Sequence, residues 1–172
     1  MFGVENTVKT LADEPRTLSF RLSAQGPLYS GPRDLCHVYI EISRREAAAK
    51  KSVPCKLDFP AYQLPLKTIL GMALDEVAAE KMRALFTREK ARDPFDLHYL
   101  VKAKHVPFDE ALANQKLAYF GQAFSFKAFT QHLSAAMKHF EKELASLAFS
   151  DLPSAREVIE TLTDWVSAPG KK

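Results

Sequence analysis

The sequence predicts an α+β fold in which a small β-rich part precedes a larger helical part. Two segments near the N-terminus alternate strictly between apolar and polar residues, which is the period of a half-buried strand. From about residue 73, apolar residues recur at three- and four-residue steps, which is the period of an amphipathic helix. We therefore place a β-rich part at residues 1–72 and a helical part at residues 73–172, joined in one continuous domain.

The composition is that of an ordinary globular protein. The chain has 172 residues, 47% of them hydrophobic and 26% charged, which is enough for one domain with a sizeable core. It contains no apolar run of the roughly 20 residues that cross a bilayer and no signal-peptide pattern. Its two cysteines do not make a disulfide framework. We therefore expect a cytoplasmic protein without a membrane partner, and the net charge of +3 leaves nucleic-acid binding to a local patch.

Two strands are predicted from their alternation. Residues 17–24 (TLSFRLSA) and residues 34–43 (DLCHVYIEIS) each place apolar side chains on one face, so we expect them to pair as an antiparallel ribbon. Residues 2–12 are expected to form a short helix, residues 44–66 a loop, and residues 67–72 a short edge strand.

Helices are predicted for most of the remaining chain. The first covers residues 74–88, and the second runs from Asp93 to about Lys104. The others start near Pro107, cover roughly residues 125–148, and cover about residues 154–167.

Charge is concentrated where the first two of these helices meet. We expect Asp93 to be the N-cap of the second helix, with Pro94 at N1 and Asp96 at N3 beside the positive helix end. Arg88 or Arg92 is then expected to pair with Asp93 or Asp96.

Several common catalytic signatures are absent from the sequence, including GxSxG, HExxH, paired CxxC and a glycine-rich phosphate loop. His132 and His139 lie two turns apart on one predicted helix, with Glu143 nearby. They can form part of a metal site or lie on a solvated helix face. No third or fourth ligand follows at metal spacing, which favours the solvated face.

Lys81 lies within the apolar stripe of its helix rather than on the polar face with Glu76 and Glu80. Its side chain can snorkel from the edge of the stripe, or it can direct its ammonium group at a phosphate or a carboxylate in a cleft. Arg88 lies two turns further along the same face.

Residues 81–92 carry five basic residues and the single acid Glu89. This segment can be a wall that attracts nucleotide or RNA phosphates, or an ordinary basic helix surface. On the second strand, Glu41 can pair with Arg21 across the ribbon, or hold Mg²⁺ beside other carboxylates.

These pieces occur together in one family. LDEVAAEKMRALFTREKARDPFDLHYL resembles the segment of the AbiEii/AbiGii-type nucleotidyltransferase toxins that contains an "AEK" motif, an arginine and "RDxxD". The preceding FRLSAQGPL and DLCHVYIEISRRE are similar to a strand pair of that family. The resemblance covers about residues 15–104, and the helical tail resembles the family's C-terminal bundle.

The resemblance implies a nucleotidyltransferase-like fold, with a small mixed or antiparallel sheet and a C-terminal helical bundle. It implies transfer of a nucleotide from an NTP to an acceptor such as a tRNA end, with Mg²⁺ as cofactor and a winged-helix antitoxin as partner. Lys81, Asp93 and Asp96 fall on catalytic positions, Lys81, Arg88 and Arg92 on phosphate-binding positions, and Glu41 on that of a metal-binding strand carboxylate.

The chain departs from the family because it contains neither the "GGT" entry nor the "DxD" pair. We therefore expect the C-terminal two-thirds of such a toxin, inactive alone, arising by truncation, gene decay, a late gene start or a split protein. We expect uncovered apolar surface to cause self-association. The alternatives are a non-catalytic module that binds an antitoxin-like protein or RNA, and a structural remnant.

Overall fold

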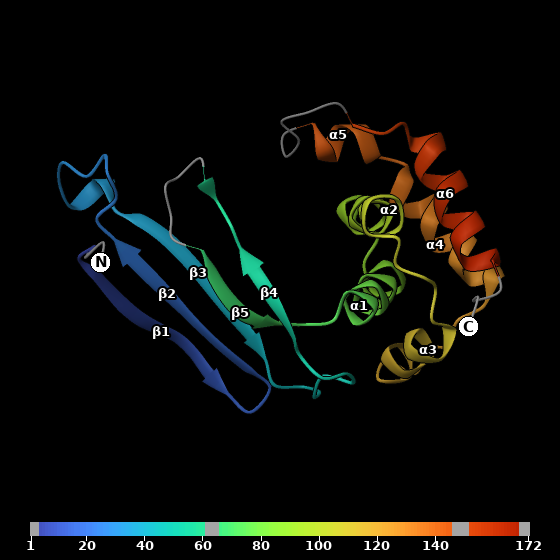
Figure 1. The fold of residues 1–172 in the computed structure, drawn as a ribbon, viewed down its shortest axis with the longest axis horizontal. Coiled ribbons are helices and arrows are strands. Elements are labelled where there is room, and N and C mark those ends of the chain that lie inside the picture. The colour runs from blue at the N-terminus through green and yellow to red at the C-terminus, as the bar shows by residue number, and fades with distance from the viewer. Residues whose placement is uncertain (1–3, 61–65, 146–151, 169–172) are drawn as a thin grey trace. The chain divides into compact units, whose positions relative to one another are not determined.

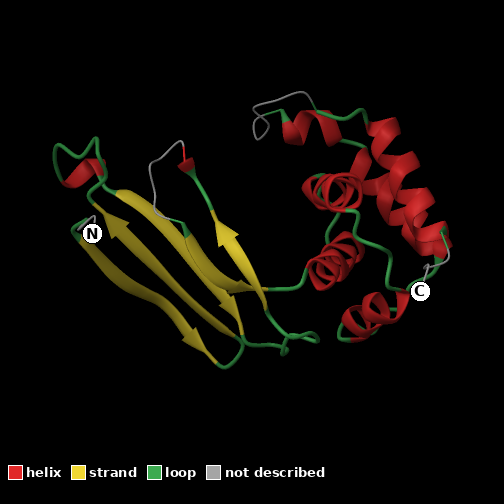
Figure 2. Cartoon of the chain, viewed as in Figure 1, coloured by secondary structure: helices red, strands yellow, loops and turns green. Residues whose placement is uncertain are grey.

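The computed structural model describes residues 4–60, 66–145 and 152–168. The chain forms two compact units, Met1–Ala47 and Ala48–Lys172, and each is described by itself. The boundary that the sequence suggests after residue 72, between a β-rich and a helical part, stays a prediction. Strands precede helices along the chain (Figure 2), so the predicted α+β class is confirmed.

The first unit contains a three-stranded antiparallel sheet in the order β1-β2-β3 (Figure 1). Its strands are β1 (Asn6–Glu14), β2 (Thr17–Ala24) and β3 (Cys36–Ser43), and a short 3₁₀ helix at Pro32–Asp34 comes before β3. The two alternating segments are therefore strands, and their predicted antiparallel pairing is confirmed.

The predicted helix at residues 2–12 is wrong, because Asn6–Glu14 form strand β1. β1 pairs with β2 from Asn6↔Ala24 to Glu14↔Thr17, and the register shifts between Thr10 and Ala12. β-branched residues such as Val8 suit this extended backbone, and the bonds to β2 hold it. Residues 2 and 3 of the predicted helix lie outside the described residues.

The register separates the side chains of this sheet into two faces. One face carries an apolar row, Val8–Leu22–Val38, and a second row that contains Phe20 and Ile40. The other face carries polar and charged side chains, listed here in rows across the strands: Thr7–Ser23–His37, Lys9–Arg21–Tyr39 and Ser19–Glu41. We call this second surface the polar face of the β1–β3 sheet.

The second unit begins with a two-stranded antiparallel sheet. β4 (Val53–Leu57) pairs with β5 (Lys67–Gly71). The strand expected at residues 67–72 is therefore confirmed, whereas the loop expected at residues 44–66 is wrong where β4 lies. Pro54 is tolerated in β4 because a strand with one paired edge does not need every N–H group.

Six described helices follow in the second unit: α1 (Leu74–Thr87), α2 (Arg92–Lys104), α3 (Glu110–Ala118), α4 (Phe126–Met137), α5 (Phe140–Leu144) and α6 (Ala155–Ser167). They agree with the predicted helices except at residues 125–148. There the predicted single helix is interrupted between α4 and α5, because the backbone of His139 is not helical. Phe140 and Leu144 still reach the core from α5. Residues 146–148 of the prediction lie outside the described residues.

The core of the second unit lies among the helices. Met82 and Leu85 of α1, Leu97 of α2, Leu117 of α3 and Phe129 of α4 are each fully buried. Trp165 of α6 also belongs to this core. It donates a hydrogen bond from Nε1 to the carbonyl oxygen of Val106, at 2.8 Å. None of the helices in the described residues is long and apolar enough to cross a membrane.

Candidate nucleotide-binding site

The corner between α1 and α2 is built around an arginine and a buried carboxylate. α1 ends at Thr87, and Arg88 follows in an extended conformation, so the chain turns before α2 begins at Arg92. Arg88 donates from Nε to Oδ2 of Asp93 and from Nη2 to Oδ1, both at 2.9 Å. The side chain of Asp93 is 0% exposed and that of Arg88 is 46% exposed. The predicted ion pair at this corner is therefore confirmed as a two-pronged contact.

The same contact explains why Asp93 is not the helix cap. α2 begins one residue earlier than predicted, at Arg92, and its N-cap residue is Ala91, which makes no side-chain cap bond. Both oxygens of Asp93 accept hydrogen bonds from the Arg88 guanidinium. This hydrogen bond, opposed by burial, raises the pKa of Arg88.

Lys81 extends from α1 towards the first turn of α2. Its ammonium group pairs with Asp96 and lies 3.6 Å from Oδ1 of Asp93. The side chain of Lys81 is 28% exposed and that of Asp96 is 40% exposed. Of the two interpretations of Lys81, the structure supports a side chain directed at carboxylates.

Lys81, Arg88, Asp93 and Asp96 are thus linked through one buried carboxylate, and we call them the Lys81–Asp96 cluster. Arg92, the first residue of α2, is exposed and forms no ion pair within the described part of the chain. The buried acid fixes the two cations, while Lys81, Arg88 and Asp96 remain partly open to solvent. An incoming phosphate can replace the partly exposed Asp96 as the partner of Lys81 without breaking the Arg88–Asp93 pair.

A second charged cluster lies on another side of α1, and it is not predicted from the sequence. The Nζ atom of Lys116 on α3 lies 2.7 Å from Oε1 of Glu76 and 3.0 Å from Oε1 of Glu80. The side chains of Lys116 and Glu76 are 2% and 0% exposed. Glu76, which the sequence places on the polar face of α1, is therefore buried against α3. A signal was present in α3, because Lys116 lies within its apolar stripe of Leu112, Ala113 and Leu117.

Glu76 also holds the start of the second unit. Its carboxylate accepts hydrogen bonds from the backbone N–H of Ala49, at 2.6 Å, and of Lys50, at 2.9 Å. Burial acts to raise the pKa of Glu76, but the bonds from Lys116, Ala49 and Lys50 outweigh it, so the pKa lies below its ordinary value. The carboxylate is therefore ionised and structural at neutral pH.

In the first unit, Glu41 lies opposite Ser19 rather than opposite Arg21. An ion pair between Glu41 and Arg21 is not formed among the described residues. The described residues also contain no group of three or more His, Cys, Asp or Glu side chains that could hold a metal ion. Glu41 is thus a single candidate ligand, and the residues described do not assemble an Mg²⁺ site.

The histidines considered as a metal site, His132 and His139, lie in different surroundings. The ring of His132 packs against Phe86, with centroids 4.8 Å apart, and His139 is exposed between α4 and α5. Glu143 accepts a hydrogen bond from the backbone N–H of Ala91, at 3.2 Å, and so supports the start of α2.

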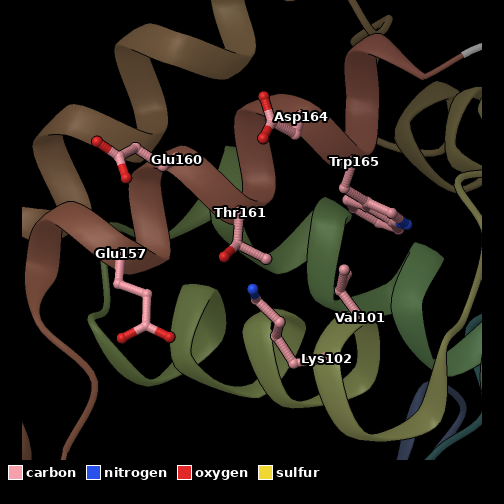
Figure 3. Close-up of a pocket in the computed structure, with 7 residues that line it drawn as sticks. All are labelled: Val101, Lys102, Glu157, Glu160, Thr161, Asp164 and Trp165. Atoms are coloured by element: carbon pink, nitrogen blue, oxygen red, sulfur yellow. The ribbon is translucent and has the colours of Figure 1, made fainter.

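A surface pocket of about 450 Å³ lies between α2 and α6 (Figure 3). Glu157, Glu160 and Asp164 line it together with Lys102 and Trp165. Three carboxylates against one ammonium group make this pocket unsuited to a triphosphate, because like charges repel. This pocket is therefore not a candidate phosphate site, and the phosphate-binding positions expected at Lys81, Arg88 and Arg92 stay a prediction.

Comparison with known proteins identifies a family for this chain. The model of a family described as "Nucleotidyl transferase AbiEii toxin, Type IV TA system" matches residues 2–163. Neither a curated protein nor a solved structure matches the chain significantly.

We predict that Asp93→Asn lowers the unfolding free energy by about 1.5–3 kcal/mol, because the charge-assisted bonds to Arg88 are weakened. Asp96→Asn is the matched control. Asp96 is 40% exposed, so its loss should cost under about 1 kcal/mol. Urea denaturation of the three proteins measures both values, and equal effects of the two substitutions would contradict the central role of Asp93.

We predict that Glu76→Gln lowers the unfolding free energy by about 3–5 kcal/mol at pH 7, because it removes the fully buried charge that pairs with Lys116 and accepts the backbone N–H groups of Ala49 and Lys50. The pKa of Glu76 is depressed below 4.5 in the folded state, so its stabilisation is present above pH 4.5 and is lost as the pH falls through the folded value. The stability difference from wild type should therefore narrow below pH 4.5. Glu141→Gln, at an exposed position, should show no such trend, and a Glu76 difference constant down to pH 3 would refute the linkage.

Proposed function

Because this chain belongs to the AbiEii family of nucleotidyl transferase toxins of type IV toxin–antitoxin systems, we propose that it binds an NTP and acts in nucleotide transfer to an RNA acceptor such as a tRNA end. The observation that carries this proposal is the Lys81–Asp96 cluster, in which two cations are held beside each other at a partly exposed helix corner. Family membership implies a nucleotide substrate and an antitoxin partner. The winged-helix type of that antitoxin and a cytoplasmic location are part of the proposal.

The proposed transfer forms a bond between an acceptor hydroxyl oxygen and the α-phosphorus. The bond from that phosphorus to the pyrophosphate oxygen breaks, and the hydroxyl proton leaves to a base or to water. Lys81, Arg88 and Arg92 bind the phosphates and neutralise the charge that develops on the leaving group. Asp93 holds Lys81 and Arg88 in place, and Asp96 holds Lys81 until a phosphate replaces it, so both carboxylates act in catalysis through these cations.

We propose that the chain does not transfer nucleotides by itself. Such chemistry depends on positioning and on a metal held by carboxylates, and Glu41 is the candidate Mg²⁺ ligand of this chain. The sequence contains neither GGT nor DxD. Asp93 and Asp96 are engaged by Arg88 and Lys81, so we assign the remaining metal ligands to a GGT and DxD region outside these 172 residues.

A non-catalytic binding module is the second candidate function. It is favoured by the pairing of Lys81 and Arg88 with carboxylates, which is a stable arrangement without any nucleotide. In that case the chain binds an antitoxin-like protein or RNA without transferring a nucleotide.

The activity test incubates the purified chain with Mg²⁺, each labelled NTP and total tRNA, beside a version that carries a family GGT and DxD region at its N-terminus. We expect only the extended protein to label tRNA. In that protein, Lys81→Ala should reduce labelling by about 10²–10³-fold, as expected for loss of a charge-stabilising group. Lys127→Ala, an exposed lysine of α4, is the control.

Two outcomes would contradict these proposals. Labelling by the 172-residue chain that Lys81→Ala abolishes would show that the chain is active alone and that other acids hold the metal. An inactive extended protein that still binds RNA would favour the binding module.

We also propose that the chain self-associates through the apolar face of the β1–β3 sheet. On that face Val8, Val38 and Ile42 are 62%, 51% and 45% exposed, and contiguous apolar surface of this kind is covered by association. Light scattering over a concentration series should show a mass above the monomer, and Val38→Thr with Ile42→Thr should lower it. A monodisperse monomer at every concentration would refute the proposal.

A further inference from the structure

The polar face of the β1–β3 sheet carries two cations directly opposite each other. Lys9 of β1 is the register partner of Arg21 of β2, and Arg21 is the partner of Tyr39 of β3. Because directly paired residues point to the same face, the three side chains form one row. Neighbouring strands are about 4.8 Å apart, so the row extends about 10 Å across the sheet.

This pairing is unfavourable in the protein alone. Like charges directly opposite each other on antiparallel strands destabilise a sheet. Neither Lys9 nor Arg21 forms an ion pair in the part of the chain that the structure describes. The Nε atom of Arg21 is moreover buried and lacks a hydrogen-bond partner there. An anion between the two groups would remove the repulsion and supply an acceptor for the guanidinium.

An aromatic ring lies at the end of the same row. Tyr39 is 66% exposed, although an aromatic ring gains most when it is covered. In the next row, the Oγ atom of Ser23 lies 3.0 Å from Nδ1 of His37, which fixes the imidazole ring beside Tyr39. The face thus combines unneutralised cations with an exposed ring, which is the combination that binds a phosphate and a base together.

We propose that the row Lys9–Arg21–Tyr39 binds a single-stranded RNA segment, with a phosphate between Lys9 and Arg21 and an unpaired base stacked on Tyr39. The choice of RNA as the strand rests on the proposed function, in which RNA is the acceptor. The face is exposed on both edge strands rather than enclosed, which suits a continuous strand better than a free nucleotide. Glu41, the candidate metal ligand, lies in the next row of the same face, so the RNA passes beside it.

The test measures anisotropy of a short fluorescein-labelled single-stranded RNA with the full chain at several salt concentrations. Tyr39→Ala should weaken binding roughly 5–100-fold, as expected for loss of one stacked base, and Tyr39→Phe should restore it. Arg21→Gln should reduce the slope of log K against log salt by about 0.7, because one phosphate contact is lost. Arg33→Gln, an exposed arginine of the same unit outside the sheet, should change binding much less than Tyr39→Ala.

The proposal would be overturned if Tyr39→Ala and Arg33→Gln weakened RNA binding equally. It would also be overturned if the same RNA as a duplex competed with the labelled single strand as well as the unlabelled single strand does. A third contradicting outcome is that the Tyr39 and Arg21 variants lose ATP binding but keep RNA binding. Photocrosslinking of thiouridine-containing RNA to the wild-type chain does not depend on any variant folding. It should label the β3 peptide that contains Tyr39, and labelling only elsewhere would also overturn the proposal. RNA binding needs no NTP, so its failure is distinct from failure to label tRNA.

Discussion

The helical unit depends on a carboxylate that has no contact with water. Glu76 is 0% exposed, and it remains ionised because Lys116 and the backbone N–H groups of Ala49 and Lys50 all donate to it. A buried charge is tolerated only when such partners are in place. The position of α3 and of the segment before β4 is therefore fixed relative to α1 by one side chain, since any displacement leaves a charge without its partner.

The same requirement sets the rotation of α1 about its own axis. Glu76 and Glu80 lie one turn apart and face Lys116 on α3, while Lys81 is rotated by about 100° from Glu80 and faces α2. The apolar residues Met82 and Leu85 occupy a third side and pack into the core. Because three sides of one helix are specified by different partners, the direction of the Lys81 side chain follows from contacts that do not involve any ligand.

Sequence periodicity was enough for the elements whose pattern is regular. The strands β2 and β3, expected at residues 17–24 and 34–43, and the helices α1 and α6 are predicted correctly because alternation or a 3.6-residue repeat runs through each of them. β1 was missed because the register shift between Thr10 and Ala12 breaks its alternation, and because its stability comes from pairing with β2.

The candidate site was predictable only in part, for a related reason. Arg88 and Asp93 are five residues apart, so their pairing could be expected from the sequence. The sequence does not show which groups the Asp93 carboxylate binds, because a carboxylate at a helix start can accept hydrogen bonds either from backbone N–H groups or from a guanidinium. Lys116 and Glu76 are 40 residues apart, and only the packing of α3 on α1 brings them together. The Lys9–Arg21 pair likewise depends on a strand that the sequence did not reveal.

The shift between Thr10 and Ala12 also bears on how this sheet avoids uncontrolled growth. An extra residue on an edge strand bends it and interrupts the row of free N–H and C=O groups to which a further strand would add. β1 carries that irregularity, and β2, whose TLSFRL sequence combines β-branched, aromatic and aliphatic residues, is enclosed between two partners. This strand is thereby kept in the middle of the sheet, and the edge that β1 forms is a poor template for further strands.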